Sequence, residues 1–168
     1  NSGACHGALA GKGGFRLSLL GYDADSDHFT ITSQDQGRRI EPSDSASSLV
    51  LAKPTMEVAH KGGLTLEKVS LNYRIIKEWI DSGSHGPKVD DAKLVGVEVL
   101  PGNFRVTLGC QQQLIVRARY EDGRLEDVTH WARFSSSNAT VAEVDSNGLV
   151  KIVGKGRGSI VAWFASRI

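Results

Sequence analysis

Cysteine, methionine and proline are scarce in this sequence, which has 2 Cys, 1 Met and 4 Pro among 168 residues. Two cysteines as far apart as Cys5 and Cys110 do not make the disulfide framework that stabilises small secreted scaffolds. We therefore expect Cys110 to be a free thiol in a protein core. The apolar runs fall well short of the roughly 18 residues of a membrane-spanning helix. No transmembrane segment is predicted.

A strong charge of either sign is also lacking. The sequence has 20 Lys and Arg against 19 Asp and Glu, which gives a formal net charge of +1. Because proteins that bind nucleic acid or anionic membranes usually carry a basic excess, neither partner is predicted. The chain also begins without a methionine or a signal peptide, as expected of an N-terminus that was processed or cut.

A Cys5-His6 pair stands close to the N-terminus. In a c-type haem attachment signal, a cysteine sulfur bonds a haem vinyl group and the histidine that follows binds the iron. The first cysteine of that signal, expected about three residues upstream of the second, is not in the sequence. Three interpretations stay open from the pair alone. A first cysteine precedes Asn1, the haem is held by one thioether, or no haem is bound.

Two further side chains that bind haem iron occur together in the segment 53–63. Its proline and glycines predict a loop. The loop carries Met56 and His60, a thioether and an imidazole, and both groups are known axial ligands of haem. The sequence therefore offers two rival candidates for a second axial ligand.

An amphipathic α-helix is predicted over 71–80. Ser70 is a suitable N-cap for it, and Gly83 is a suitable stop. Its apolar face carries Tyr73, Ile76, Trp79 and Ile80. Three further predictions are a helix over 46–52, an extended segment over 15–20 and a solvated acidic turn over 23–27.

The hydrophobic period changes from helical to alternating after the small, polar segment 82–87, which predicts a domain boundary. Short strands are predicted over 95–99, 114–120, 141–144, 149–153 and 160–164. Strands this short with regularly spaced turns predict an antiparallel sandwich. We expect Trp131 and Phe134 to fill the space between its two sheets, and its last strand to be lacking.

A series of short motifs runs in order through the first half of the chain. They are Ala4-Cys5-His6-Gly7, the segment Gly11 to Leu19, Gly21-Tyr22-Asp23, Gly37-Arg38-Arg39, Ser48 to Leu51, Lys53-Pro54-Thr55, His60-Lys61-Gly62-Gly63 and Tyr73 to Gly83. Together they resemble a planctomycete-type cytochrome c domain. The resemblance implies a small, mainly α-helical domain with one covalently attached haem c.

The resemblance also implies roles for particular residues. Cys5 would form the thioether, and His6 would be the proximal axial ligand of the iron. His60 would be the distal ligand, with Met56 as the alternative. Arg38 and Arg39 are candidates for contacts with the haem propionates, although a solvated basic pair explains them equally well.

The second half carries Tyr120 to Gly123, Asp127-Val128-Thr129, Trp131 to Phe134, Val141 to Asp145 and Gly148-Leu149-Val150. These motifs resemble a bacterial Ig-like domain of group 2. We therefore expect two domains: a cytochrome c-like haem domain over 1–86, a linker over 87–93 and an all-β Ig-like sandwich over 94–168.

The function expected from the sequence is electron transfer without catalysis, in a periplasmic or cell-surface protein. The cytochrome c module would exchange electrons with a redox partner, in the same polypeptide or another, and the Ig-like module would act as a spacer or docking domain. The alternative is a haem-free adhesion or scaffold module. A haem enzyme or gas sensor is a third hypothesis, which requires an exchangeable position on the iron.

Overall fold

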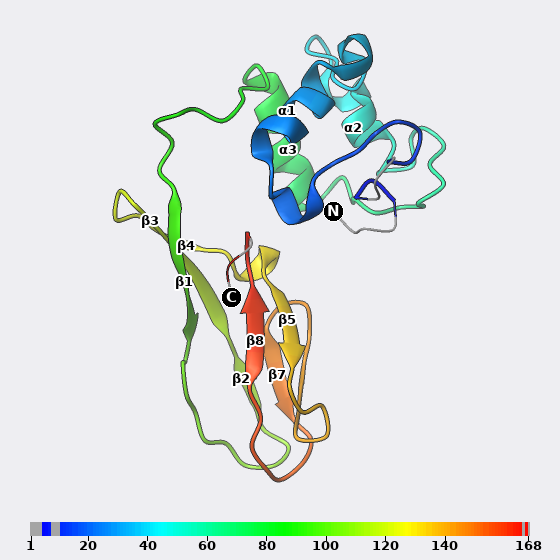
Figure 1. Cartoon of the computed structure of the whole chain (residues 1–168). Coiled ribbons are helices and arrows are strands. Elements are labelled where there is room, and N and C mark those ends of the chain that lie inside the picture. Colours follow the sequence, from blue (N-terminus) through cyan, green and yellow to red (C-terminus); the bar gives the residue numbers. More distant parts are fainter. Residues whose placement is uncertain (1–4, 8–10, 166, 168) are drawn as a thin grey trace. The chain divides into compact units, whose positions relative to one another are not determined.

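The chain divides into two compact units, residues 1–89 and 90–168, in a computed structural model that describes residues 5–7, 11–165 and 167 (Figure 1). The division falls within the segment 87–93 that the sequence identifies as a linker. Among the described residues, no helix has the length and apolar character needed to cross a membrane. Ala4, at the start of the first motif, lies outside the described residues.

The described residues of the first unit form three short α-helices: α1 (Ala24–Thr32), α2 (Leu49–Ala52) and α3 (Leu71–Asp81). Short 3-10 turns at Leu19–Gly21, Gln34–Gly37 and Ser45–Ser47 and irregular loops make up most of the rest. The prediction of a mainly α-helical, cytochrome c-like domain is therefore wrong. One physical reason is the glycine content, since Gly11, Gly13 and Gly14 all have positive φ angles, which a helix does not accommodate.

Helix α3 confirms the prediction made for it. The Ser70 hydroxyl accepts a hydrogen bond from the Tyr73 amide at 3.2 Å and caps the first turn. The helix buries Tyr73 and Ile80 against Leu51 of α2. Ile76 and Trp79 pack at the margin of the same cluster. This small core supports the loops on both sides of α2.

The shorter elements of the first unit depart from the predictions. The predicted acidic turn is the start of α1, whose Asp23 side chain accepts a hydrogen bond from the Ser26 amide at 3.0 Å. The predicted extended segment over 15–20 forms only an isolated bridge and the beginning of a 3-10 turn. The helix predicted over 46–52 is interrupted at Ser48, which has extended ψ and whose buried hydroxyl accepts from the Glu41 amide.

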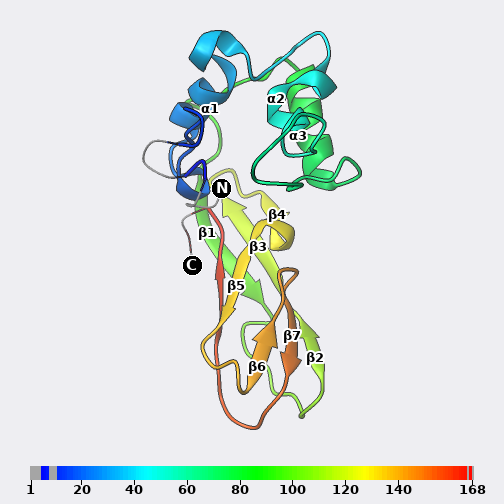
Figure 2. The same ribbon diagram turned by 90° about the vertical axis from the view of Figure 1, so that its right-hand side faces the viewer.

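Among the described residues the second unit contains eight strands: five lie close to the predicted positions, and three, over 111–113, 125–127 and 133–136, were not predicted. The eight strands are β1 (Leu94–Leu100), β2 (Gln111–Gln113), β3 (Ile115–Tyr120), β4 (Leu125–Asp127), β5 (Arg133–Ser136), β6 (Ala142–Val144), β7 (Leu149–Ile152) and β8 (Ile160–Trp163). They pair as three small antiparallel sheets, β1-β3-β4, β2-β7-β6 and β5-β8 (Figure 2). The prediction of a two-sheet Ig-like sandwich is therefore wrong. Strands β2, β4 and β6 have only three residues each, which leaves room for few hydrogen bonds to a neighbouring strand.

Two apolar clusters form the core of the second unit. One centres on Val116 and Val128, the other on Leu114 and Val150, and Phe134 packs against both. Phe134 therefore contributes to the core, although the two sheets between which it was expected do not form. Two other predictions are wrong: Trp131 is 39% exposed on a 3-10 turn, and Cys110 is an exposed thiol rather than a core residue.

Asp127 supports the segment after β4 through hydrogen bonds that favour its charged form. Its carboxylate accepts from the Thr129 amide at 3.0 Å and from the Thr129 hydroxyl at 2.6 Å. These bonds hold the pKa of Asp127 below its ordinary value of 3.8. A carboxyl group with a lowered pKa stabilises the fold above its unfolded-state pKa, and this stabilisation is lost as the pH falls through the folded-state value.

We expect Asp127→Asn to lower the free energy of unfolding by less than about 1 kcal/mol at neutral pH, because the site is exposed. The difference from the wild type should shrink towards zero as the pH falls below about 4, since both side chains are then neutral. Urea unfolding between pH 2.5 and 7 measures this difference in the free energy of unfolding, with Glu143→Gln as the matched exposed control. A difference that does not change with pH would contradict this assignment.

Candidate functional site

A cavity of about 570 Å³ opens in the first unit. This volume lies within the range of about 300–1,000 Å³ that is typical of cofactor and small-molecule sites. The walls come from the N-terminal segment, the loop before α2, α2 itself and the loop after it. Five of the six site residues identified in the sequence line the cavity: Cys5, His6, Arg38, Arg39 and His60.

The two histidines of the cavity face each other in a regular arrangement. The centroids of the His6 and His60 rings are 6.2 Å apart, and the ring planes lie within 6° of parallel. Two imidazoles that bind one metal ion from opposite sides, through bonds of about 2 Å, have centroids roughly 6 Å apart. Two residues 54 positions apart in the chain therefore have parallel imidazole rings whose centroid separation is compatible with binding one metal ion.

The hydrogen bonds of both imidazoles select the same tautomer. His6 Nδ1 lies 2.9 Å from the Phe15 carbonyl oxygen, and His60 Nδ1 lies 3.1 Å from the Gly63 carbonyl oxygen. A carbonyl oxygen only accepts, so each Nδ1 must donate its proton. Each Nε2 then carries a lone pair and can bind a metal ion. A backbone carbonyl behind a ligating histidine is the usual way in which proteins orient such a ligand.

The backbone of Gly62 holds the His60 imidazole closely. A Cβ atom added at Gly62 would lie 2.7 Å from His60 Cε1, closer than side chains tolerate. We expect Gly62→Ala to displace the His60 imidazole and to lower the affinity of the site for a metal ion or haem iron about tenfold or more. Loss of the contacts that orient a metal-binding histidine commonly has an effect of this size. Loss of the nuclear Overhauser contact between His6 and His60 checks the displacement. Gly102→Ala, where the added Cβ meets nothing closer than 3.8 Å, is the control.

Met56 does not line the cavity. Its side chain is 47% exposed, and its backbone has a φ of 66°, a left-handed conformation that is uncommon outside glycine. Between the two candidate distal ligands, the geometry therefore favours His60. The sequence alone left this choice open, because Met56 and His60 are only four residues apart.

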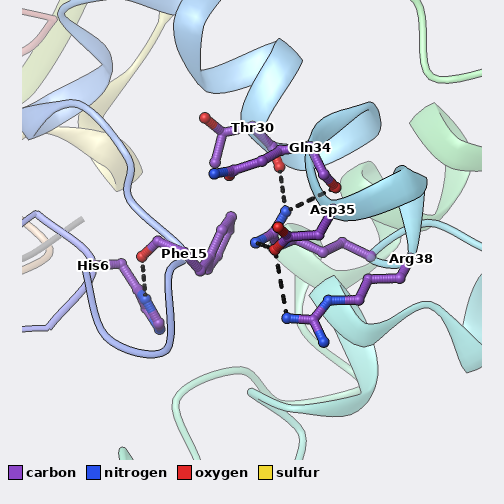
Figure 3. Close-up of polar contacts among 7 residues, drawn as sticks. His6, Phe15, Thr30, Gln34, Asp35 and Arg38 are labelled. Atoms are coloured by element: carbon purple, nitrogen blue, oxygen red, sulfur yellow. Dashed lines mark hydrogen bonds and ion pairs between the residues drawn. The ribbon is translucent and has the colours of Figure 1, made fainter. Parts of the chain in front are cut away.

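The two arginines of the cavity have different surroundings (Figure 3). The Arg39 side chain is 6% exposed and pairs with the Asp35 carboxylate at 2.6 Å. The Arg38 side chain is 60% exposed, and its contact with Asp35 is longer, at 3.4 Å. Arg39 is buried and donates three hydrogen bonds within the protein, whereas Arg38 is largely exposed and could reach an anion. The two arginines therefore do not form a pair that is equally exposed to solvent.

The remaining lining residues combine an apolar surface with positive charge. Apolar contacts come from Phe15, Leu17, Leu49, Val50 and Pro54. Lys12, Lys53 and Lys61 also line the cavity, and none of its described lining residues is Asp or Glu. These residues were not predicted from the sequence as part of the site. The resemblance was the signal that could have identified them, because its motifs include Leu49, Val50, Lys53 and Pro54.

The donor set suits a haem better than a bare metal ion. Among the described residues, no group of three or more His, Cys, Asp or Glu is placed to hold a metal ion. A porphyrin supplies four ligands itself and needs only one or two from the protein. His6 and His60 provide two, Cys5 provides an adjacent sulfur, and the cavity provides an apolar wall with cations for propionates. The residues present therefore fit haem c.

Comparison with known proteins gives a limited result. No protein-family profile matches the chain. The chain is similar to Ice-binding protein 1 of Shewanella frigidimarina, with 29% identity over 118 residues. The match covers 67% of this chain but only 13% of the length of that protein. A similarity of this extent does not establish a family.

Proposed function

We propose that this chain binds one haem c and acts as an electron-transfer module. The observation that carries the proposal is the pair of parallel imidazoles, His6 and His60, at 6.2 Å with both Nδ1 atoms directed to carbonyl oxygens. When bound, haem c supplies a one-electron couple between ferric and ferrous iron. The protein residues hold it, orient it and set its potential.

The candidate site residues would each have a part in this function. The Cys5 sulfur would form the thioether, and its neighbour His6 and the facing His60 would bind the iron. Arg38, the more exposed arginine, would be better placed than Arg39 to donate to a propionate. Two imidazole ligands favour ferric iron, so a lower potential is expected than with Met56 as distal ligand.

Ligation by two side chains favours electron transfer over the other haem-based hypotheses. A haem enzyme or gas sensor needs an exchangeable position on the iron. His60 would fill that position, and its imidazole is hydrogen-bonded to the Gly63 carbonyl and lies close to Gly62. Neither substrate nor gas would displace it readily. The proposed protein is therefore an electron carrier and not an enzyme.

The cellular setting follows from the cofactor. Covalent attachment of haem c takes place outside the cytoplasmic membrane, so we expect a periplasmic or cell-surface location. A redox partner protein or domain is required, because the residues described here supply no other redox centre. The second unit offers no cluster of catalytic residues among those described, and we assign it a spacing or docking role.

The haem-free alternative, an adhesion or scaffold module, has less support. It leaves the shared tautomer and the parallel placement of His6 and His60 without a purpose. Ice binding by the Shewanella protein gives no stronger alternative, since the matched region is 13% of that protein.

Expression of the chain in a bacterial periplasm with a haem c attachment system tests the proposal. We expect one haem per polypeptide that stays bound after denaturation and acid–acetone extraction, seen as a reduced pyridine haemochrome spectrum. Cys5→Ser should abolish the covalent bond. Cys110→Ser is the matched control, because it removes an exposed thiol from the second unit. A wild-type chain without haem would refute the proposal.

A further inference from the structure

Arg39 is a buried cation. The residues that accept its hydrogen bonds, Thr30, Gln34 and Asp35, are labelled in Figure 3. One guanidinium nitrogen, Nη1, donates to the Thr30 carbonyl at 2.8 Å and to the Gln34 carbonyl at 3.2 Å. The other, Nη2, donates to the Asp35 carboxylate at 2.6 Å. A buried charge is costly unless it is paired and hydrogen-bonded, and here both conditions hold. These contacts fix the guanidinium in one place.

The Phe15 ring connects this fixed cation to the proximal histidine. The Arg39 guanidinium carbon lies 4.8 Å from the centroid of the Phe15 ring, within the range of a cation–π contact. The His6 ring lies 4.8 Å from the same centroid, tilted by 56°. The Phe15 carbonyl oxygen accepts the His6 Nδ1 proton. Phe15 thus contacts the His6 imidazole through both its ring and its backbone.

The His6 backbone is tied to the same segment. Its carbonyl accepts a hydrogen bond from the Leu17 amide at 2.7 Å. With the backbone attached to Leu17 and Nδ1 attached to Phe15, the remaining freedom of the imidazole is rotation of the ring. The Phe15 ring restricts that rotation, and it does so only while it is itself held in place.

We propose that Arg39, held by Asp35, is a positioning residue that keeps the His6 imidazole in ligating orientation through Phe15. The inference rests on the proposed function, and it assigns Arg39 a role different from a propionate contact. Orientation of a histidine ligand by its surroundings commonly changes affinity about 10- to 100-fold. An Arg39 that merely stabilised the fold would not alter the tautomer of His6.

The first readout uses the haem-free protein, because the positioning is a property of the chain. Long-range ¹H–¹⁵N correlation spectra report the tautomer of His6 and the exchange of its Nδ1 proton. In the wild type we expect the Nδ1–H tautomer to dominate. In Arg39→Gln we expect a mixture of tautomers and an exchange rate about tenfold higher, as loss of one hydrogen-bonded contact implies.

Two further variants separate positioning from folding. Phe15→Leu keeps the Phe15 carbonyl and an apolar side chain but removes the ring, and it should disturb His6 as Arg39→Gln does. Phe15→Leu also tests the positioning role if Arg39→Gln does not fold. Arg39→Lys retains the charge without the planar fork of donors, so it should give an intermediate result. Arg74→Gln, an exposed arginine on α3 that does not line the cavity, is the matched control and should leave His6 unchanged.

The second readout is the ferric electron paramagnetic resonance spectrum of the haem-loaded variants. We expect Arg39→Gln and Phe15→Leu to add a second low-spin species, with Arg74→Gln like the wild type. Unchanged His6 tautomer and exchange in both Arg39→Gln and Phe15→Leu would overturn the inference while the proposed function stands. A wild-type chain that takes no haem would refute the function itself, whatever the variants do to His6.

Discussion

His6→Ala should abolish stable haem binding. His6 lies next to Cys5, and its Nδ1 is held by the Phe15 carbonyl so that Nε2 is free to bind iron. Without the proximal imidazole, the chain loses the iron ligand that stands beside the thioether sulfur. We expect the haem content per polypeptide to fall at least about tenfold. Absorbance of the reduced pyridine haemochrome, divided by protein concentration, measures it.

His28→Ala is the matched control for that experiment. His28 is also partly buried, but it does not line the cavity, and its Nε2 contacts the Ser84 carbonyl at 2.7 Å. Its removal should cost some stability in the first unit without changing the haem content. Equal loss of haem in both variants would mean that His6→Ala acts through the fold. Normal low-spin haem in His6→Ala would refute the role of His6.

His60→Ala and Met56→Ala should have different spectra. His60 lines the cavity and is parallel to His6, whereas Met56 is 47% exposed and outside it. We expect His60→Ala to convert nearly all of the ferric iron from low spin to high spin, because the sixth ligand is lost. Met56→Ala should remain low spin. The visible spectrum of the ferric protein distinguishes the two states.

The reverse outcome would transfer the distal role to Met56. A low-spin His60→Ala together with a high-spin Met56→Ala would require the loop 53–63 to rearrange when haem binds. Added imidazole offers a check on the expected result. It should return His60→Ala to low spin by filling the vacated position, and it should have little effect on the wild type.

The sequence predicted the candidate ligand residues and only some of the elements that carry them. Cys5, His6 and His60 were identified from ligand chemistry and from the resemblance, and all three line one cavity. Helix α3 was predicted because its cap and its apolar face are local features of the chain. Helix α1 was missed because its first turn, with Asp23, Asp25 and Asp27, is too polar to show an apolar face.

Other features depend on contacts between distant residues, which local patterns do not encode. Arg39 was interpreted as a propionate contact or as half of a solvated pair, yet Thr30, Asp35 and Phe15 surround it. Five of the eight described strands of the second unit were located from their alternation, and β2, β4 and β5 were missed. The pairing of the strands into three small sheets was not predicted. An alternating pattern shows which residues share one face of a strand, but it does not show which strand pairs with it.

The electron paramagnetic resonance spectrum of the ferric protein, recorded after haem attachment in the periplasm, tests the central claim most directly. Ligation by His6 and His60 with nearly parallel rings, 6° apart, predicts one rhombic low-spin signal typical of two imidazoles in parallel planes. A high-spin signal, a signal typical of histidine–methionine ligation, or no iron signal in the purified chain would contradict it.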